Sequence, residues 1–211
     1  MEFYTIKNNI TSEVIEKKSK FIANVIYVEN TEEVEKIIKE YKKKYFDARH
    51  NCIAYRILEE SQIIEKSSDD GEPSGTAGAP MLNILQKNNL INVLVIVTRY
   101  FGGILLGTGG LVRAYSDSLI KAIEKSNIVQ KCEGEELEVI LDYNVFENFK
   151  YYCKKNNINI IKSNYSENII CRIEIEENIK QKFINDFETK KVILKDLKYI
   201  SKKYVEKNKE N

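Results

Sequence analysis

The fold of this chain is decided by residues 93–110, which read VLVIVTRYFGGILLGTGG. Val93–Thr98 is a continuous apolar run, typical of a central strand that is buried on both faces. Five glycines then fall within residues 102–110, too many for a helix interior, so a glycine-rich loop is expected there. Apolar side chains next recur at helical spacing and predict a helix that faces the sheet: Leu111, Tyr115, Leu119, Ala122 and Ile123.

The segments before this stretch predict the remaining strands of one sheet and a further helix. Residues 19–28, SKFIANVIYV, are rich in β-branched and aromatic types and predict a strand that follows a short lead. Thr31 is expected to cap a helix whose apolar residues repeat as far as Tyr45. Residues 51–58 and 62–66 predict two short strands joined by a turn.

Residues 67–80, SSDDGEPSGTAGAP, hold both prolines and three of the nine glycines of the chain, which predicts a long loop. Pro80 is expected in the first turn of a short helix that runs through Leu85. The acidic run Asp69–Glu72 lacks the ligand spacing of a calcium-binding loop. Its carboxylates are therefore expected to accept hydrogen bonds from backbone N–H groups, and no metal is expected.

The second part of the chain has a regular pattern of its own. Strands are expected over Leu137–Leu141, Ile158–Lys162, Ile169–Ile175 and Val192–Tyr199, with helices after the first and third, in the ferredoxin-like order βαββαβ. The charged, glycine-containing stretch Lys131–Glu136 predicts the boundary, which gives domains 1–133 and 134–211. The tail Ser201–Asn211 is expected to fray.

Composition limits the classes of function. The 33 basic and 32 acidic side chains nearly balance in each half, so any contact with nucleic acid needs a local patch. No apolar stretch is long enough to cross a bilayer and no signal peptide is recognised, so a cytoplasmic protein without membrane contact is expected. Four scattered cysteines and one histidine do not make a zinc site, and no cofactor is expected.

Two glycine turns precede predicted helices, and their N–H groups could bind an anion. They are residues 74–78, SGTAG, and residues 107–110, GTGG, and neither has the G-K-[ST] ending of a P-loop. The alternative is that these glycines serve tight turns and close packing of helix on strand. Arg99–Tyr100 and Arg113–Tyr115 set an arginine near an aromatic ring, which suits phosphate contact with base stacking.

His50 is the only histidine and lies in the stretch DARHNC, residues 47–52. With Cys52 or Ser74 it could form a nucleophile–base pair. A buried cysteine beside a hydrogen-bonded histidine is the plainer interpretation, and no catalytic residue is assigned.

Three segments together form a specific signature: DARHNCIAYR at 47–56, SDDGEPSGTAGAPML at 68–82 and VTRYFGGILLGTGGLVRAYSDS at 97–118. They resemble the signature of the IMPACT/YigZ family, and the resemblance covers roughly residues 19–125. It implies an α+β fold. The N-terminal domain would have the ribosomal-protein-S5-domain-2-like sheet, with helices on one face, and the C-terminal domain would be ferredoxin-like.

The same resemblance implies a function in translation. Eukaryotic members are regulators of translation under nutrient stress that act through partner proteins, and the domain pair resembles the fourth and fifth domains of elongation factor G. The extra N-terminal partner-binding domain of the eukaryotic members is not expected here. A non-enzymatic regulator or accessory factor is therefore expected, with the ribosome, RNA or a translation-associated protein as its partner.

The signature also marks the candidate site. Binding of nucleic acid or another anion is expected at Arg49, His50, Ser74, Thr76, Arg99, Tyr100, Thr108 and Arg113. Arg99 and Arg113 would hold phosphates or carboxylates with two hydrogen bonds each, and the turns at 75–78 and 107–110 would add N–H donors. Four carboxylates are expected to order the loops, Asp47, Asp69, Asp70 and Glu72, the last three by pairing with Arg49 or Arg99.

Two other classes of function remain open. The first is a small-molecule or nucleotide-phosphate-binding enzyme that uses the glycine-rich loops near His50. The second is a scaffold that binds only proteins, which exposed apolar residues between Tyr100 and Leu106 would favour. The sequence does not specify the partner or the oligomeric state.

Overall fold

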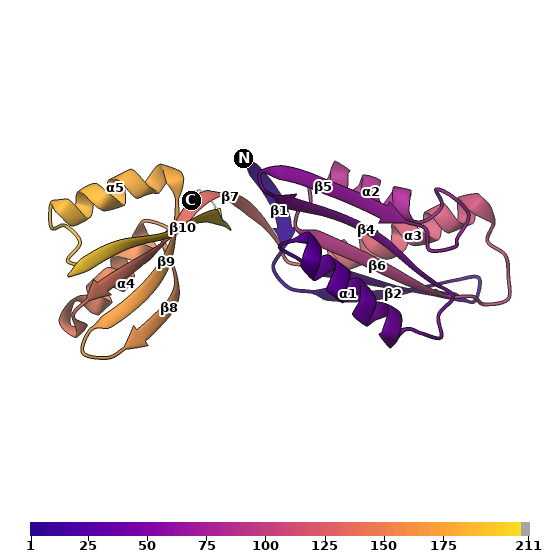
Figure 1. Cartoon of the computed structure of the whole chain (residues 1–211), viewed down its shortest axis with the longest axis horizontal. Coiled ribbons are helices and arrows are strands. Elements are labelled where there is room, and N and C mark those ends of the chain that lie inside the picture. Colours follow the sequence, from indigo (N-terminus) through magenta and orange to yellow (C-terminus); the bar gives the residue numbers. More distant parts are fainter. Residues whose placement is uncertain (208–211) are drawn as a thin grey trace. The chain divides into compact units, whose positions relative to one another are not determined.

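The computed structural model describes residues 1–207 and divides them into two compact units (Figure 1). The N-terminal unit is Phe3–Val129, and the C-terminal unit comprises Met1–Glu2 together with the residues from Gln130 onward. Each unit has its own sheet and its own hydrophobic core. The α+β class expected from the sequence is confirmed.

The N-terminal unit is built on a five-stranded antiparallel sheet in the order β2-β3-β6-β4-β5. The chain enters through β1 (Glu2–Ile6) and has three helices, α1 (Thr31–Lys44), α2 (Gly78–Lys87) and α3 (Gly107–Glu124). The strands of the sheet are β2 (Ile10–Glu16), β3 (Ser19–Tyr27), β4 (His50–Glu59), β5 (Gln62–Ser68) and β6 (Val93–Tyr100).

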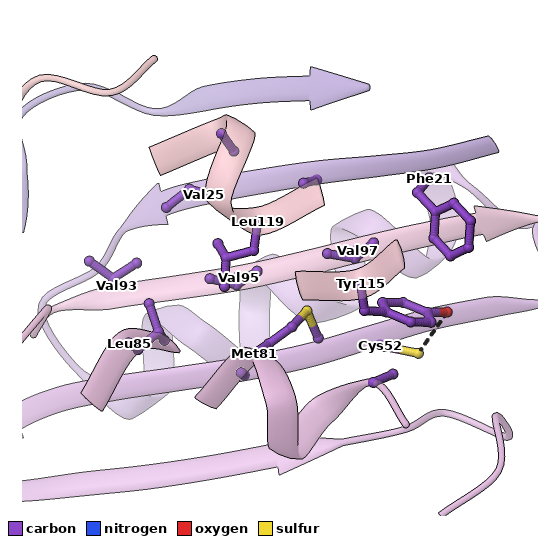
Figure 2. Packing of buried hydrophobic residues seen from close by; sticks show 14 of the residues in the cluster. Phe21, Val25, Cys52, Met81, Leu85, Val93, Val95, Val97, Tyr115 and Leu119 are labelled. Atoms are coloured by element: carbon purple, nitrogen blue, oxygen red, sulfur yellow. Dashed lines mark hydrogen bonds between the residues drawn. The ribbon is translucent and has the colours of Figure 1, made fainter. Parts of the chain in front are cut away.

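The apolar run at 93–98 forms the central strand of this sheet, as predicted, because β6 is flanked by β3 and β4. Its alternate residues enter two different cores. Val93, Val95 and Val97 pack with α2 and α3, whereas Leu94 and Ile96 pack on the opposite face. Figure 2 shows the first core, in which Met81 and Tyr115 come from the helices and Val95 comes from the strand.

The expectation of helices on only one face of this sheet was wrong. Helices α2 and α3 cover one face, and α1 covers the other through Val34, Ile37 and Ile38. The physical reason is that β3, β4 and β6 are apolar on both sides, so each face must be buried. The N-cap of α1 is Asn30, one residue before the predicted cap Thr31, since the Asn30 side chain accepts a hydrogen bond from the Glu33 N–H at 2.8 Å.

Two further expectations for this unit were wrong. The lead before residue 19 forms β1 and β2, and β2 pairs along its whole length with β3. Helix α3 begins at Gly107 and so includes glycines that were expected to form a loop. These glycines occupy the first turn of α3, where Gly110 packs closely against Leu106. A Cβ on Gly110 would lie only 3.1 Å from Leu106 Cβ. The buried apolar face further along α3 stabilises the helix.

The C-terminal unit has the ferredoxin-like order, with an antiparallel sheet ordered β10-β7-β9-β8. Its core includes Phe149 from α4 and Phe183 from α5. The elements are β7 (Ile128–Leu141), a 3₁₀ turn (Tyr143–Val145), α4 (Phe146–Lys155), β8 (Asn159–Tyr165), β9 (Ile169–Glu176), α5 (Glu177–Glu188) and β10 (Asp196–Glu206).

The stretch 131–136, expected to be a boundary, lies inside the continuous strand β7, and the two units divide at Val129/Gln130. Gly134 serves packing, because a Cβ there would collide with the Ile175 carbonyl and the Val205 side chain. The last strand begins at Asp196 and runs through most of the segment expected to fray. The end of that tail, 208–211, lies outside the described residues.

All four cysteines are buried free thiols. Within residues 1–207 no helix has the length and apolar character needed to cross a membrane.

Two glycines of the 93–110 stretch provide a matched test of packing. In Gly102→Ala, the new methyl group would overlap the backbone of Lys18 and Ser19, so we expect a loss of about 2–3 kcal/mol of unfolding free energy. In Gly109→Ala, the methyl group enters open space in the first turn of α3, so we expect no loss and a gain of up to about 1 kcal/mol. Urea unfolding measures both, and equal effects would contradict the packing described here.

Candidate functional site

A cavity of about 390 Å³ lies in the N-terminal unit where β4 begins and β6 ends. The register of the sheet explains its position, since Arg99 lies opposite His50 on one side and Phe21 on the other. Its polar wall consists of Arg49, His50, Glu72, Arg99 and Thr108. Its apolar wall consists of Pro73, Phe101, Leu105, Leu106 and Leu111.

The central contact of this pocket is a buried ion pair. Arg99 Nη1 donates to Glu72 Oε1 at 2.7 Å, and both side chains are more than nine-tenths buried. Tyr115 on α3 donates its hydroxyl to the same oxygen at 2.9 Å. The pair therefore fastens the 69–77 loop to β6 and to α3.

The guanidinium of Arg99 packs beside two aromatic rings. The group lies 5.5 Å from the Phe21 ring centroid and 5.6 Å from that of Phe101, which are cation–π distances. Its Nη2 has a long hydrogen bond of 3.5 Å to Ser19 Oγ. Its Nε is buried and has no hydrogen-bond partner. Arg99 therefore lines the pocket but has no free fork for a phosphate, contrary to expectation.

His50 and Cys52 share the face of the sheet that bears the pocket but are not hydrogen-bonded to each other. His50 Nδ1 lies 2.9 Å from the Asp70 carbonyl oxygen, which can only accept, so Nδ1 carries the proton. Cys52 donates to the Asp69 carbonyl oxygen at 2.9 Å and to the Tyr115 hydroxyl at 3.3 Å (Figure 2). Burial raises the pKa of the Cys52 thiol to about 12, so it is not an activated nucleophile.

The acidic loop caps helix α2 and does not offer free carboxylates. Asp69 accepts hydrogen bonds from the N–H groups of Gly75, Ala77 and Gly78 at 2.8–3.0 Å. Burial raises the pKa of Asp69, but the three N–H groups outweigh it and hold the pKa below its usual value. The prediction that the 75–78 turn supplies donors to a ligand was therefore wrong, because Asp69 already occupies them.

The 107–110 turn differs from the 75–78 turn in that no side chain caps it. It forms the first turn of the 18-residue helix α3, which has no side-chain cap and no acidic residue there. Gly107 and Thr108 line the pocket. The first N–H groups of a helix have no partner within it, so this turn can still serve as a donor.

The remaining candidate residues do not line the pocket. Ser74 is exposed, and Thr76 is buried with its hydroxyl donating to the Pro73 carbonyl at 2.6 Å. Tyr100 donates to Asp47 at 2.8 Å, and Arg113 is exposed on α3. Asp70 accepts hydrogen bonds from the Asn51 N–H and from Lys42. Of the four candidate carboxylates, only Glu72 pairs with Arg99, and within residues 1–207 none pairs with Arg49.

Several important residues were missed. Ser19 and Phe21 contact Arg99 from a strand to which no site residue was assigned. Tyr115 was assigned to the helix core and, beside Arg113, to base stacking, but not to a hydrogen bond with Glu72. The apolar 101–106 loop was named only as a feature that would favour a protein-binding scaffold, and three of its side chains are exposed: Phe101 at 48%, Ile104 at 43% and Leu105 at 83%. The sequence signal for them was an apolar cluster set between glycines, where no core is available. Within residues 1–207 no cluster of three histidine, cysteine or acidic side chains could hold a metal ion.

Comparison with known proteins identifies the family. The model of the Impact N-terminal domain matches residues 17–123, which hold the sheet strands β3–β6 and the pocket. The chain is also 36% identical over 185 residues to the IMPACT family member YvyE of Bacillus subtilis, covering 88% of this chain and 83% of that protein. The protein therefore belongs to the IMPACT family, as the signature predicted.

Two further likenesses extend along the chain. The IMPACT family member YigZ of Escherichia coli is 33% identical, covering 75% of this chain and 78% of that protein. A solved structure described as a hypothetical protein is 28% identical with a TM-score of 0.61, and the match covers 95% of this chain and 98% of that one. The resemblance therefore includes both units.

The Glu72–Arg99 pair should contribute strongly to stability. Glu72→Gln leaves a buried guanidinium without its carboxylate, so we expect a loss of about 3 kcal/mol of unfolding free energy. Glu65→Gln is the matched control, since Glu65 pairs with Arg56 at 2.6 Å but is partly exposed, and about 1 kcal/mol or less is expected. Urea unfolding compares the two variants, and a smaller loss for Glu72→Gln would disprove the central role of the buried pair.

The Asp69 cap should make stability depend on pH in acid. Because the pKa is lower in the folded state, the stabilisation is complete above the ordinary value of 3.8 and is lost as the pH falls through the folded value. Asp69→Asn should cost about 1–3 kcal/mol at pH 7, and its difference from the parent should shrink below about pH 4. The exposed Asp117→Asn on α3 is the control, and thermal unfolding from pH 2 to pH 7 tests both. A pH-independent difference for Asp69→Asn would contradict this account.

Proposed function

We propose that this protein is a non-enzymatic binding module that acts in translation or its regulation in the cytoplasm, and that the pocket with the 101–106 loop contacts a translation-associated protein. Membership of the IMPACT family supports the link to translation. The observation that carries the choice of partner is the exposure of Phe101, Ile104 and Leu105 beside the pocket. Apolar side chains clustered at the rim of a polar cavity are typical of protein-binding surfaces.

The geometry supports this choice over the phosphate-binding site expected from the sequence. Arg99 is already paired with Glu72, and Arg113 does not line the pocket. Of the expected arginines only Arg49 is left both exposed and at the pocket. One free arginine is a weak basis for binding RNA, whose phosphates favour clusters of positive charge.

The geometry also argues against the alternative of an enzyme at this pocket. The Cys52 thiol is protonated at neutral pH and donates to its neighbours. The Tyr115 hydroxyl is buried, and burial raises its pKa above the range in which it could act as a base at neutral pH. Several polar groups near His50 are thus engaged in hydrogen bonds that hold the loop and the strands together.

RNA binding remains a second candidate at a different place, the end of α1. Lys43 and Lys44 are exposed there, and Lys44 lies 5.0–5.3 Å from the ring centroids of Tyr41 and Tyr45. Phe46 follows and is 84% exposed. Basic side chains interleaved with aromatic rings suit single-stranded RNA.

Retention assays on immobilised protein distinguish these functions. Ribosomal subunits and the salt wash of ribosomes, which contains loosely bound factors, are applied at about 50 mM and about 300 mM salt. We expect a component to be retained at both salts and lost in Leu105→Asp, because an exposed leucine at the contact is replaced by a charge. Arg113→Ala is the control and should behave as the parent.

The other outcomes decide against this proposal. Retention could fall steeply with salt, survive Leu105→Asp and disappear when Lys43 and Lys44 are replaced by alanine. That result would indicate RNA binding at the end of α1 in place of protein binding at the pocket. The absence of retention from either fraction would remove the assignment to translation.

A further inference from the structure

Helix α3 points its uncapped first turn at the pocket. The helix is 18 residues long, begins at Gly107, and has neither a side-chain cap nor an acidic residue in its first turn. Gly107 and Thr108 both line the cavity. The N–H groups of such a turn carry partial positive charge and attract an anion.

Arg49 provides independent evidence for an anionic ligand in the same cavity. Arg99 also lines the cavity, but its guanidinium is already paired with Glu72. Arg49 is exposed at the pocket and makes no hydrogen bond or ion pair with the residues that the structure describes. The pocket therefore has a free cationic side chain beside the first turn of α3.

The charge of the pocket limits the charge of the ligand. Glu72 neutralises Arg99, and the Oε2 of Glu72 is not engaged by the pair. Of the two arginines at the pocket, only Arg49 keeps an uncompensated positive charge. A single positive charge near a carboxylate suits a monoanion better than a phosphate dianion, which Glu72 would repel.

The apolar residues of the lining limit the rest of the ligand. They are Pro73, Phe101, Leu105, Leu106 and Leu111. Two of these side chains, Phe101 and Leu105, are largely open to solvent. A ligand that fits both walls carries an apolar group directly beside its anion.

We propose that the pocket binds a carboxylate carried by an apolar peptide segment, either a C-terminal carboxylate or an acidic side chain next to an apolar residue. This rests on the proposed function, because the peptide is part of the protein partner. Arg49 and the N–H groups of the first turn of α3 hold the carboxylate, and Phe101 and Leu105 contact the neighbouring apolar side chain.

Short peptides test the proposal without the natural partner. The probes are N-acetyl-Leu-Phe as the free acid, the same dipeptide as its C-terminal amide, N-acetyl-Leu-Glu amide and inorganic phosphate. The backbone amide signals of Gly107, Thr108, Gly109 and Gly110 report binding by NMR titration. We expect the free acid to shift these signals and to bind at least about fivefold more tightly than the amide, since one charged contact is lost. Binding of the side-chain acid but not the free acid would assign the acidic side chain as the source of the carboxylate.

Two arginine variants separate the pocket from general charge. Arg49→Ala should reduce the affinity for the free acid to that of the amide, and Arg113→Ala, an exposed arginine on α3 that does not line the pocket, should leave it unchanged. Both arginines are exposed, so both variants are expected to fold.

Three results would overturn the carboxylate site. They are equal binding of acid and amide, tighter binding of phosphate than of either acid, and an equal effect of the two arginine variants. Such a result would leave the proposed function intact if Leu105→Asp still abolished retention of a partner. Loss of retention in Arg49→Ala as well as in Leu105→Asp would link the peptide site to the partner itself.

Discussion

The guanidinium of Arg99 and the carboxylate of Glu72 meet 2.7 Å apart in a region almost closed to water. Removing two charges from water is costly, and the cost is offset only when geometry and further hydrogen bonds are good. Here Tyr115, Ser19 and two aromatic rings supply those contacts. The pair thereby joins a loop, the central strand and a helix that are distant in sequence.

This constraint determines what is left for binding. Because Glu72 and Asp69 occupy Arg99 and the N–H groups of the 75–78 turn, much of the polar signature stabilises the fold. The groups that still face a ligand are Arg49, the first turn of α3 and the apolar 101–106 loop. A family signature rich in glycine and arginine thus includes residues that stabilise the fold as well as residues that remain available for binding. Membership of the IMPACT family is shown by the comparisons, and the partner is a proposal.

Local sequence patterns predicted which helices and strands form better than where they begin and end. The helices at 31–45 and from 111 onward, and the central strand at 93–98, follow from periodicity that each segment carries by itself. The lead before residue 19 was missed because its strand β2 is half exposed and is completed only by pairing with β3. The stretch around Gly134 was predicted as a domain boundary but lies in a strand, because a glycine that permits a turn also permits close approach of two strands.

The sequence by itself determined the class of fold, the βαββαβ plan of the second unit, the family and most of the residues near the pocket, since these depend on short-range spacing and on residue types. Only the tertiary structure decided which arginine stays free. Arg49 and Arg99 look alike in sequence, but β6 carries Arg99 under the 69–77 loop, where Glu72 neutralises it, while Arg49 precedes β4 and remains in water. Whether a charged side chain is paired depends on the residues that the sheet brings next to it. Such long-range pairs produce no repeating pattern in the sequence.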